Sequence, residues 1–279
     1  GVSVPLLHVY GSDVMVELKQ LLIYDELIVA VLASLLPTFI FWGWSVVFAA
    51  LDLVWYERVR HYKVQQAAPQ PTRSDYRKAT IHVIKNTLFV ELPFIYFVIC
   101  VVMPRRGVCP GGGGAAASWG DCTIVPKWWE YLVHLTVSLL VEEVLFFYGH
   151  YLFHHPAIYE RWHKLHHTFT APIGVTAKYA HPLEHLLANL VPIVAGPLLV
   201  GAHPLSLTLW MCVALTSTVI SHSGYAFPWL PEPFSHDWHH ESFTENYGVI
   251  GILDHLHGTN KRFLALSADA SAENKSKHH

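Results

Sequence analysis

Charged residues are scarce in this sequence. Only 14% of its 279 residues are Asp, Glu, Lys or Arg, whereas about 25% is usual in a soluble domain. Hydrophobic residues make up 52%. So little charge with so many apolar side chains argues against an ordinary soluble domain and indicates a membrane protein.

Cysteine is also rare, and its spacing excludes several kinds of site. The chain has 4 cysteines and no Cys-x-x-Cys pair, which argues against thiolate zinc sites, iron–sulfur clusters and thioredoxin-like redox chemistry. The net charge of −3 comes without a long basic run, so nucleic acid is not an expected partner. Histidine, by contrast, occurs 21 times, and it is where we look for chemistry.

Long apolar runs predict an all-α, multi-pass membrane bundle. The first extends from Leu27 to Leu51 without a charge, enough to cross a bilayer at about 1.5 Å per residue. It starts too late and is too long for a cleaved signal peptide. Four further runs are expected to be helical: Thr87–Met103, Tyr131 to about His154, Leu186–Ala202 and Leu205–Ile220. Only His203 and Pro204 separate the last two, which predicts a tight hairpin and about four transmembrane helices or hairpin equivalents in all.

Loop charges predict how the bundle is oriented. The connection 57–85 is rich in Lys and Arg and is therefore expected in the cytosol. The glycine-rich loop RRGVCPGGGGAAASWGDC then faces the lumen, although its two arginines argue weakly against this. Cys109 and Cys122 in this loop could pair in an oxidising lumen, or remain two free thiols. With this topology every histidine cluster lies on the cytosolic face.

Three histidine clusters share a spacing that suits metal ligands. They are HYLFH with His150 and His154, HKLHH with His163, His166 and His167, and HDWHH with His236, His239 and His240. Members three or four residues apart share a helix face, where they can grip one ion. Adjacent histidines diverge by about 100° on a helix, because one turn takes about 3.6 residues. One H-x-x-H-H cluster can therefore serve two metals lying side by side.

The number of histidines predicts two metal ions. One ion usually takes three or four protein ligands, fewer than these clusters offer. His222, in SHSGY at the cytosolic end of the predicted hairpin, could complete the ligand set. Imidazole ligands without thiolate suit iron, copper or zinc. A loose histidine-rich loop would lack the repeated spacing.

Two further residues are candidate catalytic groups. Glu143 lies seven residues before His150 on the same helix face, so it could orient a ligating imidazole or accept a proton. The alternative is an interfacial glutamate that reaches out of the membrane. His181 is expected to line the site, as a ligand or beside one. It also opens HPLEH, which matches the inverted zinc-protease pattern H-x-x-E-H, but that interpretation leaves the other clusters idle. Glu91, in the second apolar run, is unexplained.

A pair of redox metals at a membrane face favours oxygen chemistry on a lipid. Oxidising an unactivated C–H bond requires a strong oxidant, which would damage thiolate ligands but which imidazoles survive. A site on the cytosolic face suits a soluble electron donor. Its position at the ends of the membrane helices suits a lipid that enters sideways from the bilayer.

The motifs resemble those of a known superfamily. The order HYLFH, HKLHH, HDWHH, with SHSGYAFPW before the third, resembles the fatty acid hydroxylase/sterol desaturase superfamily. Within it, HHTFTAPIGVTAKYAHPLEH and LDHLHGTN resemble the C-4 methyl sterol oxidases and their fatty acid hydroxylase domain-containing relatives. The resemblance covers roughly residues 128–263. One departure is Tyr151, where the superfamily's first cluster commonly has an arginine.

The resemblance implies an enzyme of the endoplasmic reticulum membrane with its active site facing the cytosol. It implies a non-haem centre of two irons, O₂ as co-substrate, and electrons from NAD(P)H delivered through cytochrome b5 and its reductase. The implied metal ligands are His150, His154, His163, His166, His167, His222, His236, His239 and His240.

Three regions and one function follow as expectations. Residues 1–127 form a membrane region with two spans and the lumenal loop, 128–263 a fatty acid hydroxylase-type di-iron domain, and 264–279 a disordered tail. The tail ends in KSKHH, which matches a retrieval signal to the endoplasmic reticulum or is simply charged. The expected function is oxidation of a sterol C-4 methyl group. The alternatives are a fatty-acid or sphingolipid hydroxylase and a non-catalytic metal-binding regulatory membrane protein.

Overall fold

The structure is a bundle of long helices that alternate in direction. The computed structural model describes residues 25–103 and 126–277. The described part is mostly helical and contains no β-strand, only an isolated bridge between Lys63 and Tyr225. Cys109, Cys122 and the last two residues of KSKHH lie outside the described residues. The predicted all-α fold is confirmed.

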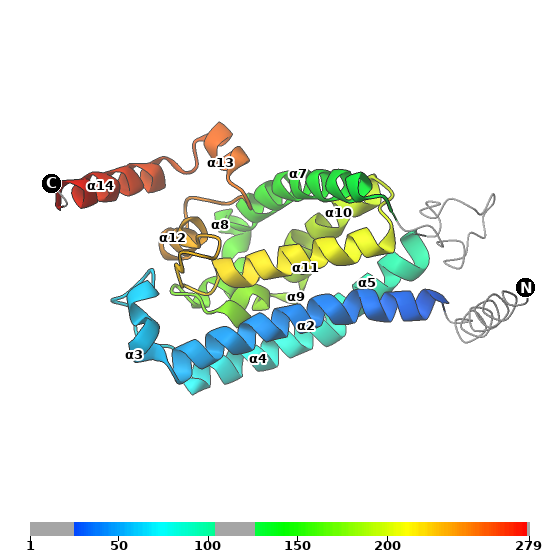
Figure 1. Ribbon diagram of the computed structural model, residues 1–279, viewed down its shortest axis with the longest axis horizontal. Coiled ribbons are helices and arrows are strands. Elements are labelled where there is room, and N and C mark those ends of the chain that lie inside the picture. The colour runs from blue at the N-terminus through cyan, green and yellow to red at the C-terminus, as the bar shows by residue number, and fades with distance from the viewer. Residues whose placement is uncertain (1–24, 104–125, 278–279) are drawn as a thin grey trace, which may run out of the picture.

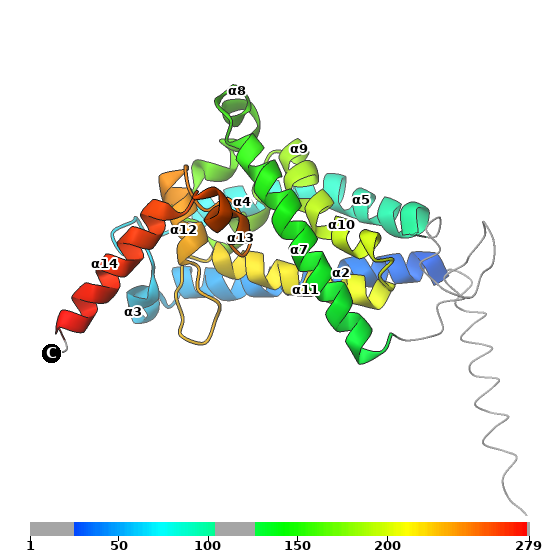
Figure 2. The same ribbon diagram turned by 90° about the horizontal axis from the view of Figure 1, so that it is seen from above.

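Five helical runs make up the bundle, and each matches a predicted apolar run. They are α2 (Asp25–Leu53); α4 (Arg73–Asn86) continued by η2 (Thr87–Glu91), α5 (Leu92–Phe97) and η3 (Val98–Val102); α7 (Trp128–Phe153); α9 (Pro182–Glu184) continued by η8 (His185–Leu190) and α10 (Val191–Leu199); and α11 (Pro204–Ser221). Figures 1 and 2 show that α2, α7 and α11 end at the same side of the bundle.

Four helices in the described residues are long and apolar enough to span a membrane. They are Leu35–Leu53, Trp128–Phe153, Pro182–Leu199 and Pro204–Ser221. Large apolar side chains on these helices point outward: Phe39 is 70% exposed and Leu132 58%. Such exposure suits contact with lipid rather than water. The predicted hairpin is present, because α10 ends at Leu199 and α11 starts at Pro204, a favoured first helical position.

Helices α7 and α10 approach each other at a glycine. A Cβ added to Gly196 would clash with the backbone of Ser138. Without a hydrophobic driving force between helices in lipid, small residues at such crossings allow the close packing that holds them together.

Gly196→Ala is therefore expected to destabilise the bundle by about 1–3 kcal/mol, the usual cost of overpacking a core. The measurement is the melting temperature of the detergent-solubilised protein. Gly43→Ala is the matched control, because a Cβ at Gly43 meets nothing within 4 Å. Equal melting temperatures for the two variants would show that the crossing is not tight.

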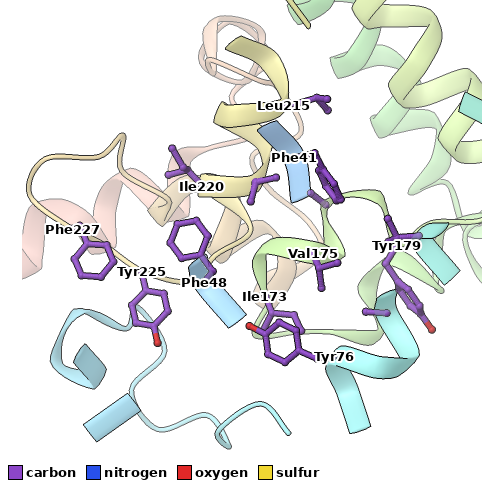
Figure 3. Packing of buried hydrophobic residues seen from close by; sticks show 14 residues of the cluster. Phe41, Phe48, Tyr76, Ile173, Val175, Tyr179, Leu215, Ile220, Tyr225 and Phe227 are labelled. Carbon is purple, nitrogen blue, oxygen red and sulfur yellow. The ribbon is translucent and has the colours of Figure 1, made fainter. Parts of the chain in front are cut away.

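Two apolar clusters form the core. One joins α5, η3, α10 and α11 around Trp210 and Ile99. The other packs α2, α4 and α11 against η7 (Gly174–Lys178), with Phe48 and Tyr225 stacked 6.0 Å apart between ring centroids (Figure 3). The second cluster includes Ile220, two residues before His222, and packs against Leu165 and Phe169, which flank His166 and His167.

Further helices, most of them short, lie at the histidine-bearing end of the bundle. They are α3 (Tyr56–Val59), η1 (Arg60–Tyr62), α8 (Pro156–Ile158), η5 (Tyr159–His163), η6 (His166–Thr168), α12 (Phe234–Ser242), α13 (Ile252–His257) and α14 (Lys261–Lys277). Helix α14 corrects the prediction of a disordered tail from residue 264. The sequence LALSADASAENKSK contains many good helix formers, which accounts for the helix despite its polar character.

Candidate metal centre

The structure brings all nine predicted ligands together in two adjacent groups. In each group the candidate ligand atoms lie within 4.8 Å of one another. The first group is His150, His154, His163, His167 and His239; the second group is His166, His222, His236 and His240. The groups touch, since the rings of His167 and His240 are 4.8 Å apart between centroids.

Both H-x-x-H-H clusters divide between the two groups, as their spacing predicts. His163 and His167, four residues apart, enter the first group, and His166 enters the second. The HDWHH cluster divides the other way, with His236 and His240 in the second group and His239 in the first. Residues four apart on a helical turn share a face, whereas an adjacent residue points elsewhere.

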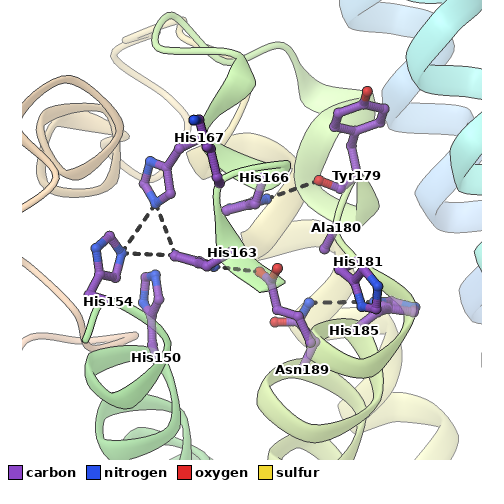
Figure 4. Close-up of polar contacts among 12 residues, drawn as sticks. His150, His154, His163, His166, His167, Tyr179, Ala180, His181, His185 and Asn189 are labelled. Atoms are coloured by element: carbon purple, nitrogen blue, oxygen red, sulfur yellow. Dashed lines mark hydrogen bonds and ion pairs between the residues drawn. The ribbon is translucent and has the colours of Figure 1, made fainter. Parts of the chain in front are cut away.

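The Nε2 atoms of each group converge on one point. In the first group, His154 and His163 approach to 2.8 Å and His163 and His167 to 3.0 Å between Nε2 atoms (Figure 4). In the second group, the Nε2 atoms of His222 and His236 are 2.9 Å apart. So close a gathering of ring nitrogens requires either shared protons or a cation.

The opposite ring nitrogens decide between these alternatives. In six of the nine histidines, Nδ1 faces an oxygen that accepts a hydrogen bond. Five of these oxygens are backbone carbonyls and one belongs to the carboxylate of Glu184. The pairs are His150 with Tyr247 O, His163 with Glu184 Oε1, His166 with Tyr179 O, His222 with Thr218 O, His239 with Glu245 O and His240 with Phe169 O. Nδ1 must then carry the proton, which leaves a lone pair on Nε2 when the ring is neutral.

Burial keeps these rings neutral. It lowers the pKa of His166 to about 4 and shifts the pKa values of His167, His239 and His240 well below the usual range. Several lone pairs then point at one centre with few protons between them, an arrangement that a bound cation stabilises. A neutral imidazole whose Nδ1 donates to a carbonyl or carboxylate is also the usual form of a histidine ligand. The donor sets therefore fit two metal ions.

Comparison with known proteins agrees with this geometry. Residues 135–259, which include every histidine of both groups, match the family model described as fatty acid hydroxylase. The chain is 32% identical over 231 residues to a candidate methylsterol monooxygenase of Dictyostelium discoideum, covering 78% of this chain and 79% of that protein. The chain belongs to the fatty acid hydroxylase family.

Other members of the family carry different names. The chain is 37% identical over 229 residues to human fatty acid hydroxylase domain-containing protein 2, covering 81% of this chain. It spans only 65% of that relative's length. It is 35% identical over 166 residues to a very-long-chain aldehyde decarbonylase of Oryza sativa subsp. japonica, covering 55% of this chain and 61% of that protein. No solved structure is significantly similar to the chain.

Glu143, the first predicted catalytic residue, lies behind the centre rather than in it. Its carboxylate accepts backbone hydrogen bonds from Val249 at 2.7 Å, Ile250 at 2.9 Å and Leu253 at 3.0 Å. The same segment contains Tyr247, whose carbonyl accepts the hydrogen bond from His150. In the described structure Glu143 thus reaches His150 only through this backbone. Of the two predicted roles, orienting a ligating imidazole is therefore possible indirectly, whereas the carboxylate that would accept a proton is taken up by three backbone donors.

His181, the second predicted catalytic residue, also lies outside both groups. Its Nδ1 accepts a hydrogen bond from the Leu183 backbone at the start of α9, and its ring packs edge-on against Trp162. The prediction that it lines the metal site is wrong, because His181 caps a helix instead. The inverted zinc-protease pattern is not assembled either, since Glu184 supports His163 from 2.8 Å.

Three supporting carboxylates escaped sequence reasoning. Glu184 orients His163. Asp254 accepts hydrogen bonds from the backbone of Tyr247 and Gly248, and Glu245 accepts them from Arg262 and Phe263. The only signals were their places in HPLEH, in LDHLHGTN and just after HDWHH. Each works through tertiary contacts that spacing does not reveal.

The structure shows the contacts of two further residues noted in the sequence, Glu91 and Tyr151. Glu91 forms a buried ion pair with Lys178, with both carboxylate oxygens 2.8 Å from Nζ. Tyr151, which replaces the superfamily's arginine, packs edge-on against Tyr247, 5.1 Å away between ring centroids. Tyr247 in turn lies 5.1 Å from the ring of His154. Tyr151 therefore packs against the aromatic ring that lies beside His154 of the first group.

Proposed function

We propose that this protein is a membrane-bound monooxygenase with a non-haem pair of iron ions that oxidises a lipid, preferentially the C-4 methyl group of a sterol. The observation that carries the proposal is the pair of adjacent groups of neutral, Nδ1-anchored imidazoles at the end of a bundle of apolar helices. The first group would hold one iron and the second group the other. Bound irons would supply the redox chemistry for inserting an atom of O₂ into a C–H bond.

The chain's own residues would prepare the site for this chemistry. The buried Nδ1 contacts fix the orientation of six imidazoles before any ion binds, so little reorganisation is needed. Burial of His163, His239 and His240, all at most 1% exposed, keeps water from the ligand nitrogens. Ligands without thiolate tolerate the strong oxidant that an unactivated C–H bond requires.

The position of the centre supports a lipid substrate. His150 lies on the last turn of α7 and His222 directly after α11, two helices long enough to span a membrane. A lipid could therefore reach the centre from within the bilayer. We propose that this end faces the cytosol at the endoplasmic reticulum, where cytochrome b5 and its reductase would deliver electrons from NAD(P)H.

A second candidate function keeps the chemistry and changes the lipid. The chain is 36% identical over 216 residues to a fatty acid hydroxylase of Mycosarcoma maydis. Tyr151 stands where the superfamily commonly has an arginine. We expect this difference to affect which lipid is bound rather than whether metal is bound. A fatty-acid or sphingolipid hydroxylase thus fits the same centre, and a non-catalytic metal-binding protein is the outcome if no lipid is oxidised.

A substrate panel under ¹⁸O₂ tests the proposal. Full-length protein in lipid vesicles is loaded with iron(II) and supplied with NADH, cytochrome b5 and its reductase. We expect one ¹⁸O atom in a product formed from a 4-methyl sterol. Product from a fatty acid or ceramide alone would support the second candidate. No labelled product from any lipid, with iron bound, would contradict the oxygenase proposal; protein stripped with a chelator is the blank.

A further inference from the structure

A buried polar network connects the N-terminal helices to the second histidine group. It begins at Asp52, near the end of α2, which is 0% exposed. The Asp52 carboxylate accepts hydrogen bonds from the hydroxyls of Tyr76 and Tyr225 and pairs with Lys63 Nζ at 2.8 Å. Asp52, Lys63 and Tyr76 all precede residue 135, where the match to the family model begins. The network therefore joins two parts of the chain.

Lys63 extends the network to the backbone beside His222. Its Nζ donates to the carbonyl of Ser223 at 3.2 Å and lies 3.8 Å from the centre of the Tyr225 ring. The neighbouring backbone is joined as well, because Val64 donates to Gly224 O at 3.0 Å and Ala226 donates to Tyr62 O at 2.8 Å. The first part of the loop that leaves His222, residues 223–226, is thus held by residues 62–64.

Gln65 reaches the two segments that flank His240. Its Nε2 lies 2.8 Å from Asp237 Oδ1 and 2.8 Å from Thr170 O. Asp237 is 1% exposed and follows His236 directly. Thr170 follows Phe169, whose carbonyl accepts the hydrogen bond from His240 Nδ1. One side chain therefore ties α12, which carries His236, His239 and His240, to the segment whose carbonyl orients His240.

The first histidine group is supported from elsewhere. Its outer contacts come from Glu184 and from the segment 245–254, which Glu143 and Asp254 hold in place. In the described structure, Lys63 and Gln65 contact the residues that follow His222 and His236 and the segment whose carbonyl orients His240, all of the second group. His239 of the first group shares α12 with His236 and His240, but its Nδ1 is oriented by the carbonyl of Glu245. The two groups, although adjacent, thus have separate supports.

We propose that Lys63, anchored on Asp52, and Gln65, bound to Asp237, are positioning residues for the metal ion of the second group alone. The inference rests on the proposed metal centre but not on the identity of the lipid. A buried Lys–Asp pair is costly unless both charges are well satisfied, so it is weak evidence for a purely stabilising role. Here the pair with Asp52 holds Lys63 against the loop that follows the candidate ligand His222.

The test is the iron content of the purified full-length chain. Wild-type protein and the variants Lys63→Met and Gln65→Ala are loaded with iron(II), freed of unbound iron and analysed by elemental mass spectrometry. We expect about two irons per wild-type chain and about one in each variant. Lys78→Met, an exposed lysine on α4, is the matched control and should retain two.

Reference variants identify which iron is lost. His236→Ala with His240→Ala removes ligands of the second group, and His154→Ala with His239→Ala removes ligands of the first. When Gln65→Ala is added to the His236→Ala/His240→Ala variant, the protein should still bind about one iron. When it is added to the His154→Ala/His239→Ala variant, the protein should bind almost none. The reverse pattern, or two irons in both Lys63→Met and Gln65→Ala, would overturn the inference.

Two other outcomes remain distinguishable. Lys63→Met leaves Asp52 buried without its cation and could prevent folding; Gln65→Ala keeps that pair intact and then decides the question. Wild-type protein that binds no iron would overturn the proposed metal centre and this inference together. Wild-type protein that binds two irons but oxidises no lipid would contradict only the enzymatic proposal.

Discussion

Replacing His166 and His167 together with alanine is expected to reduce lipid oxidation at least a hundredfold. Losing residues that merely orient a metal ligand costs about 10–100-fold in metal affinity or activity, so losing ligands from both groups should cost at least as much. His166 belongs to the second group and His167 to the first, so the double variant damages both positions. The measurements are product formation under ¹⁸O₂ and iron per chain.

The two single variants test each metal position separately. His166→Ala should lower iron content only at the second position, and His167→Ala only at the first. His61→Ala with His255→Ala is the matched control, because both histidines are exposed and lie outside the two groups. Full turnover by the His166/His167 double variant, with control-like folding, would exclude the proposed centre.

The gathering of the nine histidines could be predicted from sequence because their arrangement is local. HYLFH, HKLHH and HDWHH carry the i, i+3 and i+4 spacings that a helical backbone converts into shared faces. The same logic indicated that one H-x-x-H-H cluster would serve both groups, as His163 and His166 do. The apolar runs predicted the membrane helices for an equally local reason, namely their length and lack of charge.

The supporting residues could not be predicted because their partners are distant in sequence. The spacing puts Glu143 on the face of α7 that carries His150, but it does not reveal that residues 249–253 fold back over this glutamate. Glu184 lies 21 residues from His163, inside a motif that suggested different chemistry. Local pattern therefore identifies the ligands, whereas the tertiary fold decides what orients them.

Glu143→Gln is expected to weaken metal binding at the first group by about 10–100-fold, the usual effect of losing an orienting contact. The carboxylate accepts three backbone hydrogen bonds with its two oxygens. A glutamine has one oxygen and presents an NH₂ group to the remaining N–H donors, and a buried donor without a partner costs roughly 1–3 kcal/mol. The segment that carries Tyr247 should loosen, so that His150 loses its carbonyl partner.

Iron release by a graded chelator measures this effect for each position separately. The first iron to leave Glu143→Gln should do so at a lower chelator concentration than in wild type, while the second should be unchanged. Glu142→Gln is the matched control: Glu142 lies one residue earlier on α7 and is also buried, but in the described structure it does not hydrogen-bond to residues 249–253. Equal release from the two variants would mean that Glu143 does not position His150. A shift at the second group instead would mean that the two groups share one support, because only a common support lets a change behind His150 reach His222 and His236.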